Sequence, residues 1–321
     1  MTSSFLKNIV KEIDNEYAGL LSEGGVGDIN SFVDTGSYIF NALVSGSIYK
    51  GVPSNKITAL AGESGTGKTF FAMGVVQNYL AENPDAGVVY FESEAAITKD
   101  MIEERGIDGT RMILIPVTTV QEFRTTAIQI LDKYLQQKTE DRKPMMFVLD
   151  SLGMLSTSKE LSDSAEGKDT RDMTRAQVVK AIFRILTLKL GKANVPYLLQ
   201  ITHTMSLVPT SQLKRWVEEV DSNTLHLLSY ISLRKRRKME RKLLETLSKQ
   251  SAAKSRLTKE NASVDTRLYF DERGLDRYYG LLELGEKYGV FERKGNRIVV
   301  GDSSVYPSAI LKDPEKYFTG K

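Results

Sequence analysis

The segment that most constrains this chain of 321 residues is Gly62–Thr69, which reads Gly-Glu-Ser-Gly-Thr-Gly-Lys-Thr. It matches the phosphate-loop pattern G-x-x-x-x-G-K-[ST], follows the apolar run Ile57–Ala61 and opens a segment with helical apolar spacing. Glycines there let successive backbone N–H groups wrap a phosphate, and a helix N-terminus adds a favourable field. The alternative is an ordinary glycine-rich turn, but average residue frequencies give a chance match a probability of about 3%. The motif therefore predicts a site for a nucleotide such as ATP.

The chemistry of the motif assigns a role to each of its residues. The Lys68 ammonium would reach the β- and γ-phosphate oxygens, and the Thr69 hydroxyl would ligate Mg²⁺. The remaining residues would cradle the phosphates, namely Gly62, Glu63, Ser64, Gly65, Thr66 and Gly67.

Asp150 ends a second apolar run, Met145–Leu149, downstream of the phosphate loop. In phosphate-loop proteins a carboxylate at such a position holds the Mg²⁺ shell. A strand-ending aspartate is also commonly a turn or helix cap. Because it lies downstream of a phosphate loop, we favour the metal role for Asp150.

Glu92 and Glu94 close the apolar run Val88–Phe91, which is the next strand expected after the phosphate-loop helix. A glutamate at this place can orient and deprotonate an attacking water. Spacing alone does not choose between the two residues, and an ordinary acid at a strand end is an equally good interpretation.

The pattern of apolar residues predicts an alternation of strands and helices. Short buried strands separated by helices indicate an α/β fold with a central, mostly parallel sheet flanked by helices. The expected strands are Lys56–Ala61, Gly87–Phe91, Met112–Val117, Met145–Leu149 and Val195–Leu199, and the expected helices are Thr69–Ala81, Ile97–Arg105, Val120–Gln137 and Thr170–Leu190. The polar residues 156–172 are expected to form a mobile loop, and Tyr278–Val300 a small unit of helix and strand.

Composition excludes several classes of chemistry. The chain has no cysteine and only two histidines, so zinc fingers and cysteine nucleophiles are ruled out. It has neither an uninterrupted apolar run long enough to span a membrane nor an N-terminal secretory segment, so we expect a cytoplasmic protein with no membrane partner. The net charge of +3, from 44 basic and 41 acidic residues, is too small to identify a polyanionic partner.

Several segments together resemble the RecA-family recombinases, in particular the T4-type phage recombinases. The similarity covers about residues 30–199 and 253–318. The segments that carry it are Asp34–Ser37, Gly62–Thr69, Phe91–Glu94, Val148–Gly153, Asp172–Ala176, Phe183–Ile185, Lys254–Arg256 and Tyr279–Gly285.

The resemblance implies a RecA-type ATPase core and a homologous-recombination and DNA-repair protein. Such a protein is a DNA-dependent ATPase that forms a helical homo-oligomeric filament on single-stranded DNA and exchanges strands with double-stranded DNA. Recombination mediators and single-strand-binding proteins are its expected partners, and the host-cell cytoplasm its location if a phage encodes it. The alternatives are a RecA-core ATPase of another kind, such as a helicase, or a remnant that binds ATP without productive DNA coupling.

The resemblance also implies residue roles. Glu94 takes the position of the catalytic glutamate, which selects it over Glu92. Met101 falls near the position that contacts adenine. Lys254 and Arg256 match basic residues that reach the nucleotide of a neighbouring protomer, and residues 156–172 match a first DNA-binding loop.

The resemblance predicts three regions along the chain. Residues 1–50 would serve polymerisation, residues 51–270 would form the ATPase core, and residues 271–321 would form a small C-terminal element.

Residues 199–252 do not match the family pattern. The family has an Asn-His-Thr segment and then a glycine-rich second DNA-binding loop, whereas no glycine stands between Thr204 and Ala253. His203 is the nearby candidate for the family's γ-phosphate-sensing histidine, but it lies one residue further from Pro196 than the pattern gives.

Back-translation of residues 215–221, read from the third base of each codon, permits Met-Gly-Gly-Gly-Ser-Gly. We therefore hypothesise that residues 199–252 are frameshifted by two compensating insertions or deletions.

The basic run Arg234–Lys238 lies inside this segment and has three interpretations. Clustered cations can bind the DNA backbone, and they can equally form a solvated helix face. The frameshift makes the run an accident of A-rich codons, which is the interpretation we favour. Residues 225–247 have helical propensity, so a helix without a suitable partner surface is expected there.

Overall fold

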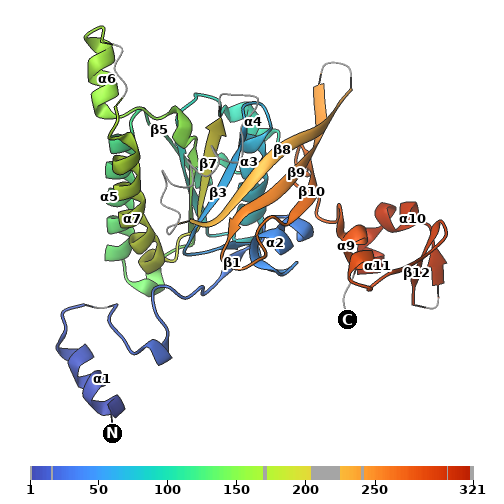
Figure 1. Cartoon of the computed structure of the whole chain (residues 1–321), viewed down its shortest axis with the longest axis horizontal. Coiled ribbons are helices and arrows are strands. Elements are labelled where there is room, and N and C mark those ends of the chain that lie inside the picture. Colours follow the sequence, from blue (N-terminus) through green and yellow to red (C-terminus); the bar gives the residue numbers. More distant parts are fainter. Residues whose placement is uncertain are drawn as a thin grey trace.

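An eight-stranded sheet forms the centre of the protein in a computed structural model that describes residues 2–15, 17–168, 172–203, 225–239, 242–301 and 303–318. Its strands lie in the order β10-β9-β8-β3-β7-β6-β4-β5 (Figure 1). Their bounds are β3 Ile57–Glu63, β4 Gly87–Glu92, β5 Met112–Pro116, β6 Met145–Asp150, β7 Tyr197–His203, β8 Leu225–Met239, β9 Lys242–Ser255 and β10 Ser263–Tyr269.

Most neighbouring strands of this sheet are parallel. β8, β3, β7, β6, β4 and β5 pair in parallel, and only β9 and β10 join in antiparallel orientation. The predicted α/β fold with a central, mostly parallel sheet flanked by helices is therefore confirmed. Parallel pairing brings the carboxyl ends of the strands to one edge of the sheet, which is where ligands bind in open α/β sheets.

Helices cover both faces of the sheet, and alternate residues of each strand point to opposite layers. Val89 of β4 and Phe147 of β6 pack with α5 and α7, whereas Val88 and Met146 pack with α2, α3 and α4. These helices are α2 Tyr38–Ser45, α3 Lys68–Glu82, α4 Lys99–Glu103, α5 Val120–Gln136 and α7 Arg175–Ala193. Because both faces are buried, the central strands are nearly continuous apolar runs, which explains the sequence signal.

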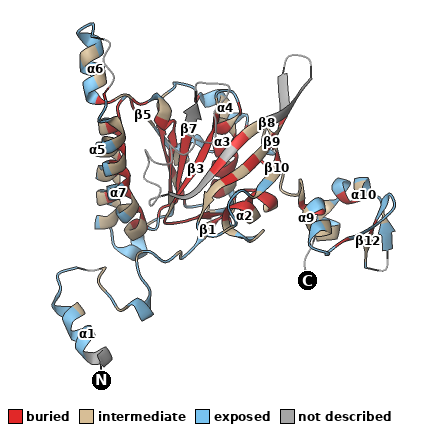
Figure 2. Cartoon of the chain, in the orientation of Figure 1, coloured by how far each residue is buried: buried red, intermediate tan, exposed pale blue. Residues whose placement is uncertain are grey.

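Smaller elements lie outside the central sheet. The N-terminal helix α1, Thr2–Glu12, stands away from the sheet and exposes most of its side chains (Figures 1 and 2). A separate apolar cluster holds the C-terminal element together. The remaining elements are β1 Phe32–Val33, β2 Val52–Pro53, α6 Ser158–Ala165, α9 Leu281–Lys287, β11 Glu292–Lys294, β12 Arg297–Val300, β13 Ser303–Val305, α10 Pro307–Lys312 and α11 Pro314–Phe318. Within the described residues, no helix is both long and apolar enough to cross a lipid bilayer.

Residues 156–172 differ from the expected loop, because they contain the helix α6. The Thr157 hydroxyl accepts the backbone N–H of Glu160, and the Glu160 side chain accepts the backbone N–H of Thr157. This reciprocal capping box is visible in the sequence Thr-Ser-Lys-Glu and stabilises the start of a helix. The polar composition of residues 156–172 favoured a loop and obscured that signal.

The helix expected over residues 225–247 is wrong. This stretch instead contains β8 and the first part of β9, and the two strands pair with each other as a long antiparallel hairpin. β8 also pairs with β3, whose backbone N–H and C=O groups need a partner on that side. Sheet pairing thus overrides the helical propensity of the local sequence.

The inner face of this hairpin is unusually polar. Ser229 of β8 and Gln250 of β9 are buried, and the polar atoms of both side chains lack hydrogen-bond partners. Thr246 and Ser248 stand at alternate positions before Gln250 in β9, so the three side chains lie on the same face. Both residues are also buried. An unpartnered buried polar group costs about 1–3 kcal/mol. The segment that departs from the family pattern therefore fits the core poorly.

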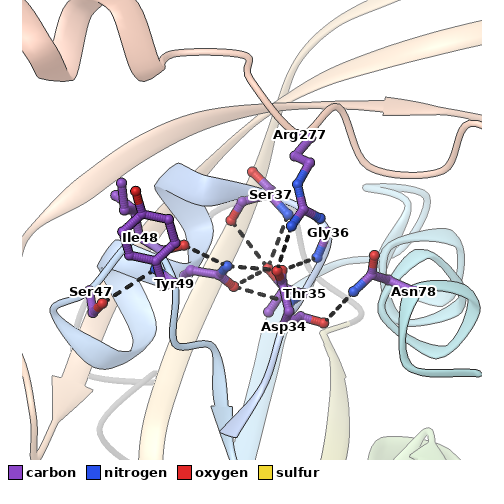
Figure 3. Close-up of polar contacts among 10 residues, drawn as sticks. Asp34, Thr35, Gly36, Ser37, Ser47, Ile48, Tyr49, Asn78 and Arg277 are labelled. Atoms are coloured by element: carbon purple, nitrogen blue, oxygen red, sulfur yellow. Dashed lines mark hydrogen bonds and ion pairs between the residues drawn. The ribbon is translucent and has the colours of Figure 1, made fainter. Parts of the chain in front are cut away.

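Asp34 ties several elements together next to the central sheet (Figure 3). Its carboxylate accepts the side-chain amide of Asn41 in α2 at 2.9 Å and pairs with the Arg277 guanidinium at 3.0 Å. Its backbone oxygen accepts the amide of Asn78 in α3 at 2.8 Å. Gly36 follows with a φ of 84°, a left-handed conformation that favours glycine. The turn thus links the phosphate-loop helix to the connection that leads into α9.

Candidate nucleotide-binding site

The predicted phosphate loop lies between β3 and α3, at the carboxyl edge of the sheet (Figure 1). Gly65 and Gly67 have φ values of 75° and 90°, which residues other than glycine rarely adopt. The loop lines a cavity of about 270 Å³ together with Glu94, Thr246 and Phe270. A cavity against a helix N-terminus and a glycine-rich loop has the form of a phosphate site.

Gly62 begins the loop against strand β8. A Cβ atom at this position would meet the backbone oxygen of Ile231 at 2.5 Å, which is closer than real Cβ contacts. Glycine is therefore required here by the close approach of two strands, independently of any phosphate.

Lys68 lies almost entirely inside the protein, with 5% of its surface exposed. Its ammonium donates hydrogen bonds to the backbone oxygens of Gly62 at 3.0 Å and Glu63 at 2.8 Å. Burial lowers the pKa of Lys68, and the nearby carboxylates of Asp150 and Glu94 partly oppose that shift. An ammonium has three donors, so one remains for a phosphate oxygen.

Asp150 and Thr69, the two predicted Mg²⁺ ligands, lie within hydrogen-bonding distance of each other. The Thr69 hydroxyl donates to Oδ2 of Asp150 at 2.6 Å, and the phenol of Tyr90 donates to the same oxygen at 2.9 Å. Burial raises the pKa of Asp150, whereas these two hydrogen bonds lower it. No sequence motif distinguished Tyr90, because it stands in an apolar run and only the sheet brings it to Asp150.

The oxygen donors of this site suit Mg²⁺. The ion takes hard oxygen ligands, and proteins usually bind it through one or two carboxylates together with substrate phosphates and water. Thr69 and Asp150 supply a hydroxyl and one carboxylate. Among the described residues, no group of three or more acidic or histidine side chains forms a cage for a metal. The donors therefore fit a Mg²⁺ ion that arrives with a nucleotide.

The structure separates the two candidate glutamates. The buried carboxylate of Glu92 accepts the backbone N–H groups of Glu94, Ala95 and Ala96 at 3.0, 2.7 and 2.7 Å, so it organises the turn after β4. Glu94 is exposed and lines the phosphate cavity. Its Oε1 accepts a hydrogen bond from the Ser151 hydroxyl at 3.0 Å. Of the two, only Glu94 lines the phosphate cavity.

Met101 lies in α4, close to the phosphate cavity. It lines a second cavity of about 340 Å³ with Thr98 and Arg105. Phe70 and Phe270 line both cavities, so the two are adjacent. A ligand bound by its phosphates at the loop would find Met101 and two phenylalanine rings next to it, together with polar and charged side chains.

Lys254 and Arg256 lie at the other end of the sheet. Lys254 pairs with Leu228 near the start of β8, and β8 begins beside Ile57, at the amino end of β3. The phosphate loop follows the carboxyl end of β3. The structure therefore does not bring these two residues to the nucleotide site of their own chain.

The DNA-binding segments expected from the resemblance are only partly described. In the first, the Thr157 hydroxyl donates to the Asp172 carboxylate at 2.8 Å across the base of α6, while residues 169–171 lie outside the described residues. The second would fall within residues 204–224, which also lie outside them. The backbone of His203 pairs with Glu63, beside the phosphate loop, but its side chain is not described.

Comparison with known proteins identifies a relative of this chain. The chain is 28% identical over 260 residues to the recombination and repair protein of Enterobacteria phage T4. The match covers 80% of this chain and 64% of that protein, so the chain spans less than two thirds of its relative's length. No protein family model matches the chain.

Proposed function

We propose that this chain is an ATP-dependent recombination and DNA-repair protein with a RecA-type core. It would form filaments on single-stranded DNA and promote strand exchange with a duplex. The main observation in support is that four predicted site residues lie together at one edge of the mostly parallel sheet, namely Lys68, Thr69, Asp150 and Glu94. The chain is also similar to a recombination and repair protein. The convergence supports ATP hydrolysis, and the similarity supports the DNA role.

In this proposal each side chain performs a distinct task. Lys68 and the loop N–H groups stabilise negative charge on the transferring phosphoryl group. Thr69 and Asp150 hold Mg²⁺, which when bound neutralises charge on the phosphate oxygens. Glu94 orients and deprotonates the attacking water, with its own position fixed by the Ser151 hydroxyl.

DNA contact would involve the segment 156–172, whose cationic residues in the sequence are Lys159, Lys168 and Arg171. Of these, Lys168 forms an exposed ion pair with Glu166. Lys254 and Arg256, which lie far from their own nucleotide site, would reach the nucleotide of a neighbouring protomer in the filament. Hydrolysis would then be coupled to assembly, and single-strand-binding and mediator proteins would act on that filament.

A second candidate is a remnant that binds ATP without productive DNA coupling. The polar inner face of the β8–β9 hairpin favours it, because Ser229 and Gln250 are buried without partners. The absence of glycine between Thr204 and Ala253 points the same way, since a glycine-rich loop would bind DNA in the resembled family.

Measurement of ATP hydrolysis with and without single-stranded DNA separates the two. For a recombinase we expect DNA to stimulate turnover strongly, and Lys68→Ala and Glu94→Gln to abolish that stimulated turnover. Lys99→Ala, at an exposed surface ion pair, is the matched control and should behave as the parent chain. Turnover that DNA does not stimulate supports the remnant, and turnover that survives both substitutions contradicts the site itself.

A further inference from the structure

Tyr90 belongs to the phosphate edge, which is the carboxyl edge of the sheet beside the phosphate loop, and neither the motifs nor the resemblance assigned it a role. It lies in the middle of β4 and is fully buried, at 0% exposed. Its phenol nevertheless makes a defined hydrogen bond, donating to Oδ2 of Asp150 at 2.9 Å. A buried hydroxyl that has found a charged acceptor is held in place, because losing that partner costs the full desolvation of both groups.

The sheet explains how Tyr90 reaches Asp150. Its Cα pairs with Val148 of the neighbouring strand β6, two residues before Asp150. Residues two apart on a strand lie on the same face, and an aromatic side chain can reach a diagonal neighbour on the next strand. The tyrosine ring therefore extends along the α3 side of the sheet toward its carboxyl edge.

The Asp150 carboxylate thereby receives two donors on a single oxygen. Thr69 donates to Oδ2 from the first turn of α3, and Tyr90 donates to the same atom from β4. Two donors from different elements fix the rotation of the carboxylate, so its other oxygen, Oδ1, has a defined place. Hydrogen bonds of this kind, made to a metal ligand from behind, orient the ligand and tune its affinity for the ion.

We propose that Tyr90 is a positioning residue for the metal site, which holds Asp150 in the orientation that binds the divalent cation of a nucleotide complex. This inference rests on the proposed nucleotide site, and it adds a residue that acts through Asp150 and touches neither phosphate nor water. Its chemistry predicts that removing the phenol oxygen weakens metal binding while nucleotide binding through the loop persists.

The test is Tyr90→Phe in the full chain, with Mn²⁺ as the probe and electron paramagnetic resonance as the readout, at saturating ADP. We expect the dissociation constant of Mn²⁺ to rise roughly tenfold, as for loss of other groups that orient a metal ligand. The affinity for ADP in the presence of EDTA should stay within about twofold of the parent chain, because the loop and Lys68 are untouched.

Tyr197→Phe is a closely matched control. Tyr197 is also fully buried in the central sheet, on β7, but its hydroxyl has no hydrogen-bond partner in the structure. Its loss should leave Mn²⁺ affinity unchanged. Equal weakening by both substitutions would show a general packing effect and overturn the proposal.

A double-mutant cycle that combines Tyr90→Phe with Asp150→Asn gives a second measurement. In that background Tyr90→Phe should change Mn²⁺ affinity no further, since the hydrogen bond acts through the carboxylate. Unchanged Mn²⁺ affinity in Tyr90→Phe alone refutes the role of Tyr90. Failure of the parent chain to bind ADP refutes the nucleotide site instead, so the two failures are distinguishable.

Discussion

The same sheet buries polar side chains in two places, and it treats them differently. At the phosphate edge, Asp150 accepts hydrogen bonds from Thr69 and Tyr90, and the Lys68 ammonium donates to two backbone oxygens. In the β8–β9 hairpin, Ser229 and Gln250 are as deeply buried, yet their polar atoms have no partner.

The contrast distinguishes buried polar side chains that form part of a site from buried polar side chains that are only enclosed in the core. Buried polar groups of folded proteins are nearly always hydrogen-bonded, and those of functional sites are held by networks. Ser229 and Gln250 fall in the segment whose sequence departs from the resembled family, although Tyr197 and Thr266 outside that segment also bury hydroxyls without a partner. Ser229 and Gln250 agree with the hypothesis that residues 199–252 come from a shifted reading frame, because such a sequence carries no selection for an apolar inner face.

The largest effect should come from the apolar half of the sheet. Phe147 of β6 is fully buried and contacts the rings of Phe91 and Tyr197. Phe147→Ala should lower the free energy of unfolding by about 3–5 kcal/mol, because it leaves a cavity in close-packed surroundings. Urea denaturation followed by circular dichroism measures this change. Thr246→Ala, in the hairpin, should cost less than about 1 kcal/mol, and a comparable loss at both positions would contradict the contrast.

Replacement of the orphaned amide should stabilise the protein. Gln250 lies opposite Ile231 and Val264 in the register of the sheet. Gln250→Leu removes an unpartnered polar group and adds apolar burial, so we expect a gain of about 1–3 kcal/mol in unfolding free energy. Gln129→Leu, at an exposed position of α5, is the control and should change stability by less than about 0.5 kcal/mol. A loss of stability with Gln250→Leu would mean that the amide has a partner.

The pH dependence of stability tests the partnered side of the comparison. Burial lowers the pKa of Lys68, so the folded chain releases this proton at a lower pH than the unfolded chain. Between the two pKa values the unfolded state binds more protons, and the Lys68 contribution to unfolding free energy therefore rises with pH. The unfolding free energy of the parent chain should therefore rise relative to that of Lys68→Met between pH 7.5 and pH 9.5.

Paired denaturation curves of the two proteins at both pH values measure this difference, since all other titrations cancel. A constant difference would show that the lysine is solvated in the folded state.

The smallest effect concerns Thr266 of β10, which pairs with Ser248 and has a buried hydroxyl without a partner. Thr266→Val conserves the shape and removes the hydroxyl, so we expect a gain of about 0.5–1 kcal/mol, seen as a small rise in Tm. The same change at Thr157, whose hydroxyl caps α6 and donates to Asp172, should instead cost about 1 kcal/mol. Effects of equal sign at the two positions would break the distinction.

The coding DNA provides a test that needs no protein. We expect an alternative frame across residues 199–252 to encode a loop with consecutive glycines, flanked by one compensating insertion or deletion on each side. If no frame encodes such a loop, the segment is a genuine divergence, and the orphaned groups of the hairpin require another explanation.

Local sequence patterns were sufficient to predict the parts of this protein in which local pattern and tertiary environment agree. Apolar runs located β4 and β6, and Gly62–Thr69 located the phosphate loop, because a buried parallel strand and a phosphate cradle each demand particular residues at fixed spacing. The capping box of Thr157 and Glu160 was available in the same way, although the segment was expected to be a loop.

The remaining features depend on contacts between residues that lie far apart in the sequence. Glu92 and Glu94 stand two residues apart with the same chemistry, and the turn after β4 directs one to backbone N–H groups and the other to the cavity. Residues 225–247 have helical propensity, yet pairing with β3 makes them strands. The Tyr90 phenol on β4 donates a hydrogen bond to Asp150 on the neighbouring strand β6. In each case the deciding partner lies far away in sequence, and local pattern carries no information about a contact made by the sheet.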